Sequence, residues 1–154
     1  MPDRRYRVLL VSSSGGVLLD LLALKPWWSR HEVTWVCVPA PDTTPLLCGQ
    51  RVHWEPEQSV RRPLGVVAAS LRALAILRAE RPQLIISAGT GVAVGVFLAG
   101  RLLRIPAVWL ETLNIVTKPG IASRICGQLA AAVLLQRPEL MQHRRRAVYI
   151  GELY

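Results

Sequence analysis

The chain has few of the residues that hold metal ions or form disulfides. Its 154 residues include three cysteines, Cys37, Cys48 and Cys126, and three scattered histidines. The cysteine count is odd, and neither a CxxC pair nor the Cys/His spacing of a zinc site is present. We therefore expect no metal site, and we expect the cysteines to be small buried residues of a protein in a reducing compartment.

Two nucleotide-binding fingerprints are also missing. No GxGxxG sequence is present, and no acidic residue ends the second expected strand, as a dinucleotide-binding fold requires. The GK[ST] ending of a P-loop is absent as well. These absences argue against a self-sufficient nucleotide-binding enzyme.

Neither long apolar stretch is typical of a targeting or spanning segment. The basic and then apolar N-terminus breaks at Ser12 and reaches Asp20 without a small-residue cleavage site, which argues against a signal peptide. Residues 83–100 carry no charge and approach the length of a membrane span. The SAGTG interruption at residues 87–91 favours a buried strand, a glycine turn and a buried helix instead.

Acidic residues and lysines are scarce. Ten Asp and Glu stand against 19 Lys and Arg, only Lys25 and Lys118 are lysines, and the formal net charge is +9. This basicity suits nucleic acid, an anionic membrane or a phosphate-bearing substrate, or it serves solubility alone. With 51% hydrophobic and 19% charged residues, the composition is that of one ordinary globular domain over residues 1–154.

Apolar runs alternate with segments of helical periodicity. We expect strands at residues 5–11, 32–38, 51–54, 83–87, 105–110, 131–135 and 147–150, and helices at residues 16–24, 64–80, 91–103 and 119–130. Pro26 should end the first helix, residues 39–45 should be a loop, and Val67, Leu71, Leu74 and Leu77 should share one face of the second helix. The central strands lack polar alternation, which predicts an α/β, Rossmann-like fold: a parallel sheet with helices on both faces.

Two glycine-rich loops should lie at the carboxyl edge of this sheet, where ligands of such folds bind. The first, SSSGG, supplies Ser13, Ser14, Gly15 and Gly16, and the second supplies Gly89, Thr90 and Gly91. Glycines allow close backbone approach, and helix N-termini favour anions. The alternative is a pair of tight turns with serine as the helix cap. Two such loops on one edge favour a cleft for an anionic or sugar-bearing ligand.

A third loop follows the strand that ends at Leu110. Glu111 stands where a strand delivers a side chain to the cleft, and it could accept a proton from a hydroxyl group or bind a sugar. Alternatively, it is a structural acid that pairs with an arginine or caps a backbone group. Asn114 is a second polar candidate in this loop.

Two surface features could meet a membrane or a phosphate. The Pro26-Trp27-Trp28 corner suits a membrane interface, or else it is a packed helix end. The run of arginines at residues 144–146 resembles a basic patch, although short charge runs are usually solvated.

With these residues in view, the chain resembles a known family. The stretches "LLVSSSGGVLLDLLAL", "ERPQLIISAGTGVAVGVFLAGRLLRIPAVWLET" and "AVYIGELY" are similar to the membrane-associated, acceptor-side subunit of two-part glycosyltransferases. One branch makes dolichol-linked chitobiose from UDP-N-acetylglucosamine, and another transfers glucuronosyl groups in bacterial exopolysaccharide synthesis. Both glycine loops are more distantly similar to the N-terminal domain of the peptidoglycan N-acetylglucosamine transferase.

The resemblance implies the N-terminal half of a glycosyltransferase B architecture, which binds a lipid-linked sugar acceptor at the cytoplasmic face of the cell membrane. It implies a peripheral protein, a separate donor-binding subunit that brings the UDP-sugar, no cofactor or metal and no nucleic-acid partner. Glu111 would then be catalytic, and the two glycine loops with Asn114 would bind the acceptor diphosphate. The resemblance also implies a partner interface at the C-terminal residues Gly151, Glu152, Leu153 and Tyr154.

One residue departs from the family pattern. Relatives commonly have histidine at the position of Val17, and valine can neither transfer a proton nor form a hydrogen bond. Either the reaction relies on Glu111 and backbone N–H groups, or activity is weakened. A non-catalytic scaffold that recruits a catalytic partner to the membrane is the alternative function.

Overall fold

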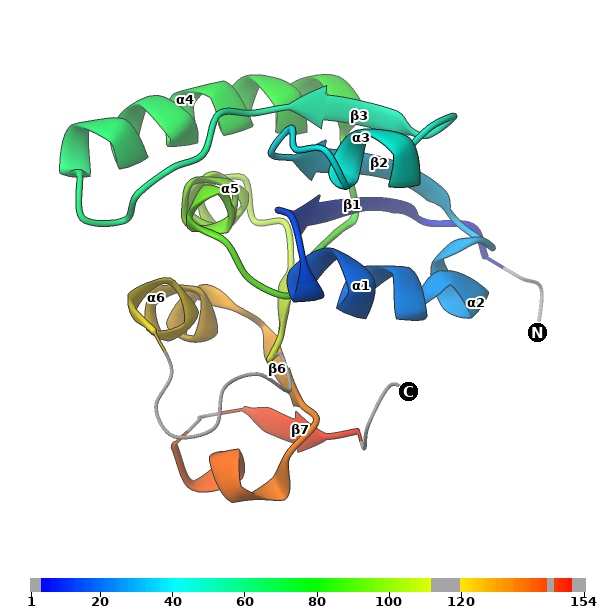
Figure 1. Ribbon diagram of the computed structural model, residues 1–154. Helices are drawn as coiled ribbons and strands as arrows, with labels where there is room; N and C mark the ends of the chain where they lie inside the picture. Colours follow the sequence, from blue (N-terminus) through cyan, green and yellow to red (C-terminus); the bar gives the residue numbers. More distant parts are fainter. Residues whose placement is uncertain (1–3, 112–119, 144–145, 151–154) are drawn as a thin grey trace.

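The described part of the chain is built on one sheet of seven parallel strands. The computed structural model describes residues 4–111, 120–143 and 146–150 (Figure 1). The strands are β1 (Arg7–Ser12), β2 (Glu32–Cys37), β3 (Arg51–Trp54), β4 (Leu84–Ser87), β5 (Ala107–Leu110), β6 (Ala132–Leu135) and β7 (Ala147–Tyr149). Their order across the sheet is β3-β2-β1-β4-β5-β6-β7, and every neighbouring pair is parallel. The predicted fold class is confirmed.

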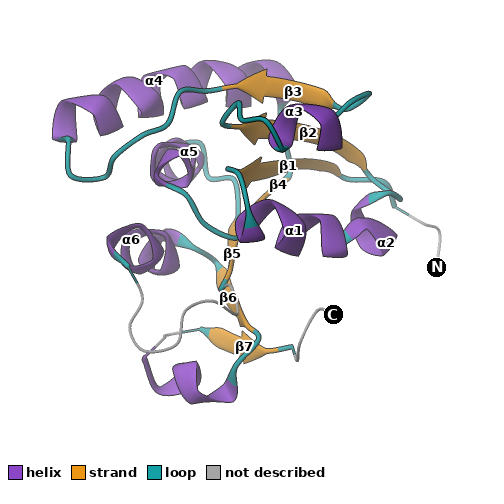
Figure 2. Cartoon of the chain, viewed as in Figure 1, coloured by secondary structure: helices purple, strands orange, loops and turns teal. Residues whose placement is uncertain are grey.

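Helices cover both faces of the sheet (Figure 2). They are α1 (Gly16–Ala23), α2 (Lys25–Trp28), α3 (Thr43–Leu46), α4 (Pro63–Glu80), α5 (Gly91–Leu102) and α6 (Ile121–Leu129), with a 3₁₀ helix at Pro138–His143. One hydrophobic core lies between the sheet and α4, α5 and α6, and the other lies under α1, α2 and the end of α3. The strand order runs from β1 outward to β3 on one side and from β4 outward to β7 on the other, so it reverses between β1 and β4. Ligands of doubly wound sheets bind at such a reversal point.

The strand pattern follows from burial on both faces. In β1, Leu9 and Val11 point into the α5 core while Val8 and Leu10 point into the α1 core, and all four are at most 1% exposed. Successive side chains of a strand alternate between faces, so a strand buried on both faces is a continuous apolar run.

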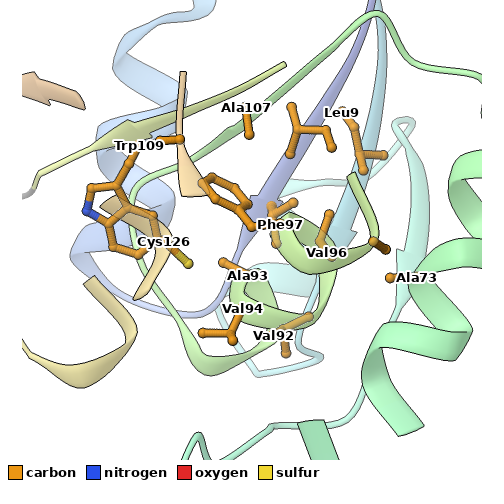
Figure 3. Packing of buried hydrophobic residues seen from close by; sticks show 14 of the residues in the cluster. Leu9, Ala73, Val92, Ala93, Val94, Val96, Phe97, Ala107, Trp109 and Cys126 are labelled. Atoms are coloured by element: carbon orange, nitrogen blue, oxygen red, sulfur yellow. The ribbon is translucent and has the colours of Figure 1, made fainter. Parts of the chain in front are cut away.

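Helix α5 is the centre of the larger core (Figure 3). Its valines and alanines are buried, and Phe97 meets Trp109 edge-on, with ring centroids 5.8 Å apart. The uncharged stretch of residues 83–100 is therefore β4, a turn and α5, as predicted. Among the described residues, no helix combines the length and apolar character needed to cross a membrane.

The predicted inner face of α4 is wrong at two positions. Val67 and Leu71 are 56% and 63% exposed, and the helix instead buries Ala69, Ala73 and Leu77. The reason is the close approach of α4 to α5. A Cβ at Gly95 of α5 would lie 3.1 Å from the backbone and Cβ of Ala69, so only small side chains fit at the contact.

The Pro26-Trp27-Trp28 corner is a packed helix end. Pro26 does not end helical structure but lies in the first turn of α2. The Trp28 indole is 5% exposed, donates a hydrogen bond to the Leu21 carbonyl at 2.8 Å and meets Trp35 edge-on. The membrane alternative for this corner is therefore not supported.

Two smaller expectations are also corrected. Helix α3 begins at Thr43, inside the segment expected to be a loop, because one short turn of helix carries no periodic signal. Cys48 is exposed, whereas Cys37 and Cys126 are buried as expected.

Candidate functional site

The two glycine loops meet at the carboxyl edge of the sheet. They follow β1 and β4, which are neighbours, and a Cβ at Gly89 would lie 2.9 Å from Cγ2 of Val17 at the start of α1. Gly89 has φ +155°, outside the usual range of L side chains. A glycine is thus needed where the loops touch, and the loops form one continuous surface.

Gly15 shapes the first loop. Its φ of 79° and ψ of −143° fall in a region used almost only by glycine, and its carbonyl accepts the first hydrogen bonds of α1 from Leu18 and Leu19. No side chain caps the helix, so the serine-cap alternative is not formed. Ser14 and Gly15 are exposed, Ser13 is half-buried, and a Cβ at Gly15 would meet no atom within 4 Å. The loop is open to a ligand.

Asp42 joins this loop from another segment. Its Oδ2 accepts a hydrogen bond from the Gly15 amide at 3.0 Å. An amide expected to face an anion is therefore already bonded to a carboxylate. Sequence reasoning missed this residue, although its position soon after β2 places it at the same sheet edge.

Ser87 links the second loop to β1 by side-chain hydrogen bonds. Its Oγ lies 2.9 Å from the carbonyl oxygens of both Val11 and Gly89, and it accepts a bond from the Gly89 amide at 3.3 Å. Thr90, the residue before α5, has φ 99°, an uncommon conformation for a non-glycine residue. The second loop is thus held in a strained and fixed shape.

Gly91 has a packing role in addition to the ligand-binding role predicted for it. A Cβ there would collide with the backbone oxygen of Gln58, which lies between β3 and α4. The side chain of Gln58 also covers Gly65 in the first turns of α4. Gly91 is therefore needed for chain packing, and the start of α4 lies beside the start of α5.

Glu111 is buried at the end of β5, the strand next to β4. It is 1% exposed, and its two carboxylate oxygens lie 2.9 and 3.0 Å from the donating hydroxyl of Ser123 in α6. Its carbonyl accepts a hydrogen bond from the Gln136 amide at 3.2 Å. The carboxylate is held in one place and shielded from solvent.

Several predicted residues lie outside the described part of the chain. Asn114 and the expected partner interface, residues 151–154, belong to this group. Among the described residues, no three His, Cys, Asp or Glu side chains gather closely enough to hold a metal ion.

Comparisons with known proteins place this site in context. No family model matches the chain. The chain is 22% identical over 97% of its length to the UDP-N-acetylglucosamine--N-acetylmuramyl-(pentapeptide) pyrophosphoryl-undecaprenol N-acetylglucosamine transferase of Oceanobacillus iheyensis. It is 30% identical over 61% of its length to the Geobacillus thermodenitrificans enzyme of the same name. It spans only 38% and 26% of these two proteins.

The fold is that of half a glycosyltransferase B protein. The chain matches the crystal structure of Acinetobacter baumannii MurG with a TM-score of 0.79 at 22% identity, over 94% of this chain and 45% of that one. It also matches a UDP-N-acetylglucosamine 2-epimerase from Rickettsia bellii, with a TM-score of 0.73 at 11% identity, over 97% and 46% of the chains. The sequence similarity is to transferases, while the fold is shared with epimerases.

Proposed function

We propose that this chain is the acceptor-binding half of a UDP-sugar-dependent glycosyltransferase that acts on a polyprenyl-diphosphate-linked sugar in polysaccharide or oligosaccharide synthesis. One observation carries the proposal: the two glycine loops meet at the sheet's reversal point in a chain that is similar to such transferases. Open loop backbone at the start of a helix suits a diphosphate.

The acceptor diphosphate is assigned to the exposed and half-buried residues of the two loops. Ser13 and Ser14 supply hydroxyl donors, and Gly16, Gly89 and Thr90 supply backbone at the helix starts. Because the Gly15 amide is bonded to Asp42, we assign that amide to holding the loop in shape. The Asp42 carboxylate then lies near the acceptor, where it can accept a hydrogen bond from a sugar hydroxyl.

In the proposed reaction, the acceptor hydroxyl attacks the anomeric carbon of the UDP-sugar. The new carbon–oxygen bond forms as the bond to UDP breaks, UDP leaves with the electron pair, and Glu111 accepts the hydroxyl proton. Ser123 orients the Glu111 carboxylate.

The source of the donor-binding half is a further part of the proposal. The chain corresponds to 45% of the MurG chain that it matches. We propose that a separate donor-binding subunit supplies the other half and the UDP-sugar, as in the two-part enzymes that the sequence resembles.

An exposed apolar stripe on α4 is the proposed membrane contact at the cytoplasmic face. Leu64, Val67 and Leu71 are 86%, 56% and 63% exposed, and exposed Arg61 and Arg62 precede them. Apolar side chains beside arginines suit an anionic bilayer surface. Through Gln58 this end of α4 lies beside the second glycine loop, so a membrane-bound stripe would present the site to a lipid-linked acceptor.

The test is reconstitution. The chain is co-expressed with candidate donor-binding subunits, and the complex is given labelled UDP-N-acetylglucosamine or UDP-glucuronic acid with a membrane lipid extract. Labelled lipid that forms only with both proteins supports the proposal. Transfer by the chain alone contradicts the two-part arrangement.

A scaffold without catalytic residues is the second candidate. It is favoured by Val17, which offers no proton-transfer group, and by the Asp42 carboxylate on the Gly15 amide. In the reconstituted complex, Glu111→Gln separates the two: a loss of transfer with the complex intact supports catalysis, and unchanged transfer supports the scaffold.

A further inference from the structure

A cavity lined by arginines lies at the amino edge of the sheet. It has a volume of about 420 Å³, and the described residues of its lining include Arg101, Arg104 and Arg146 but no acidic residue. These arginines come from the last turn of α5, the turn before β5 and the residue before β7. Because all strands are parallel, this edge is opposite to the glycine loops, so the inference is independent of the proposed function.

The backbone around the cavity is fixed. The Ile105 amide donates to the Gly100 carbonyl at 2.8 Å and closes the turn that carries Arg104. The Val133 amide donates to the Arg146 carbonyl at 3.2 Å, which ties that residue to β6. The cavity is therefore pre-formed at the backbone, and only the arginine side chains need to order around a ligand.

Ordinary structural roles explain only one of the three charges. Arg101 complements the negative end of the α5 dipole, but Arg104 and Arg146 lie outside helices. Both have left-handed backbone, with φ 57° and 58°, where glycine would be unstrained. Among the described residues, none of the three forms a salt bridge with an acidic side chain.

We propose that this cavity binds a phosphoryl anion with more than one phosphoryl or ester group, either a free diphosphate or an anionic phospholipid headgroup. A planar guanidinium donates two parallel hydrogen bonds to phosphate oxygens, and three converging arginines can surround such a group. The cavity is larger than orthophosphate needs, and its lining also includes the small residues Pro106, Ala107 and Ala131, which leave room for the second group.

The structure offers a matched control. Arg81 also has left-handed backbone, with φ 49°, and lies outside the cavity lining. Arg81→Gly, Arg104→Gly and Arg146→Gly each remove one charge and relieve similar backbone strain. All three variants should therefore fold with a stability close to that of the parent without ligand, because the relieved strain offsets the greater freedom of glycine in the unfolded chain.

The first measurement is the affinity for pyrophosphate at constant ionic strength, read by calorimetry and by thermal shift. We expect Arg104→Gly and Arg146→Gly each to weaken binding about tenfold, and Arg81→Gly to leave it unchanged. The second measurement is co-sedimentation with vesicles of phosphatidylglycerol and of phosphatidylcholine.

The two measurements separate the sources of the anion. Arginine-dependent pyrophosphate binding supports the site with a free ligand. Phosphatidylglycerol binding that falls in the cavity variants but not in Arg81→Gly supports the site with a headgroup. Equal responses of all three variants, or no response to either probe, overturn the proposal.

Discussion

Replacing Gly15 by alanine tests whether the first glycine loop binds the acceptor. With φ 79° and ψ −143°, Gly15 lies in a region where alanine costs about 1–3 kcal/mol of stability. A domain of this size has a reserve of about 5–15 kcal/mol, so the variant should still fold. The added methyl group points into open space, between Ser14 and Gly16, which are assigned to the diphosphate.

Gly49 provides the matched control. It has φ 78°, it also has open space around an added Cβ, and it lies before β3 at the opposite edge of the sheet. Gly49→Ala should cost about 1 kcal/mol through the same kind of backbone strain. Both variants therefore carry backbone strain, but only Gly15→Ala also changes the candidate site.

The assay is the initial rate of sugar transfer by the complex as the lipid acceptor is varied. We expect Gly15→Ala to raise the acceptor KM about tenfold, because the methyl group obstructs a hydrogen bond from a neighbouring residue to the diphosphate, and we expect Gly49→Ala to leave the KM unchanged. Denaturant titration of both variants checks that each remains folded. Equal acceptor KM values in the two variants would refute the assignment of the diphosphate to this loop.

Three further outcomes are expected. The exposed Cys48 should react with a thiol reagent in the folded protein, whereas the buried Cys37 should react only after unfolding. Burial raises the pKa of the Cys37 thiol to about 11 in the folded protein, so Cys37 contributes stability below about pH 9 that is lost as the pH rises towards 11. Denaturant titrations across this pH range would show the loss. Ser123→Ala should lower kcat of the complex with little change in acceptor KM, because Glu111 loses its orienting donor; an unchanged kcat would contradict that role. Leu64→Glu should reduce binding to anionic vesicles about tenfold while circular dichroism stays unchanged, and full binding by this variant would remove α4 as the membrane contact.

The sheet could be predicted because its strands carry one simple signal. A strand buried on both faces must be apolar at every position, so β1, β4 and β5 are visible as runs that end at small or polar residues. Alternating helical segments then predict parallel strands, and parallel strands bring the ends of β1 and β4 to one edge. The two glycine loops, although far apart in the sequence, could be placed together for this reason.

The orientation of α4 could not be predicted in the same way. The helix has two apolar stripes, one with Leu64, Val67 and Leu71 and another with Ala69 and Ala73. Periodicity favours the stripe with larger side chains. The choice depends instead on how closely α5 approaches, and that is set by a glycine in a different helix.

The same limit applies at the candidate site. The sequence shows small, flexible residues and predicts free amides for an anion, but it does not show which amides other parts of the chain already occupy. The amide of Gly15 donates its hydrogen bond to the carboxylate of Asp42, and the backbone of Gln58 fills the space beside Gly91.

These two contacts change how the glycine loops should be understood. A loop whose amides were all free would attract any anion to the helix starts. Here a carboxylate lies at one of them, and it repels a phosphate at that point while it can bind a sugar hydroxyl. The arrangement therefore favours an acceptor that has both a diphosphate and a sugar over a simple phosphate ion. A lipid-linked sugar carries both a diphosphate and a sugar, whereas the ligand proposed for the arginine cavity needs only the phosphoryl groups. The two sites should therefore differ in whether a sugar is required for binding.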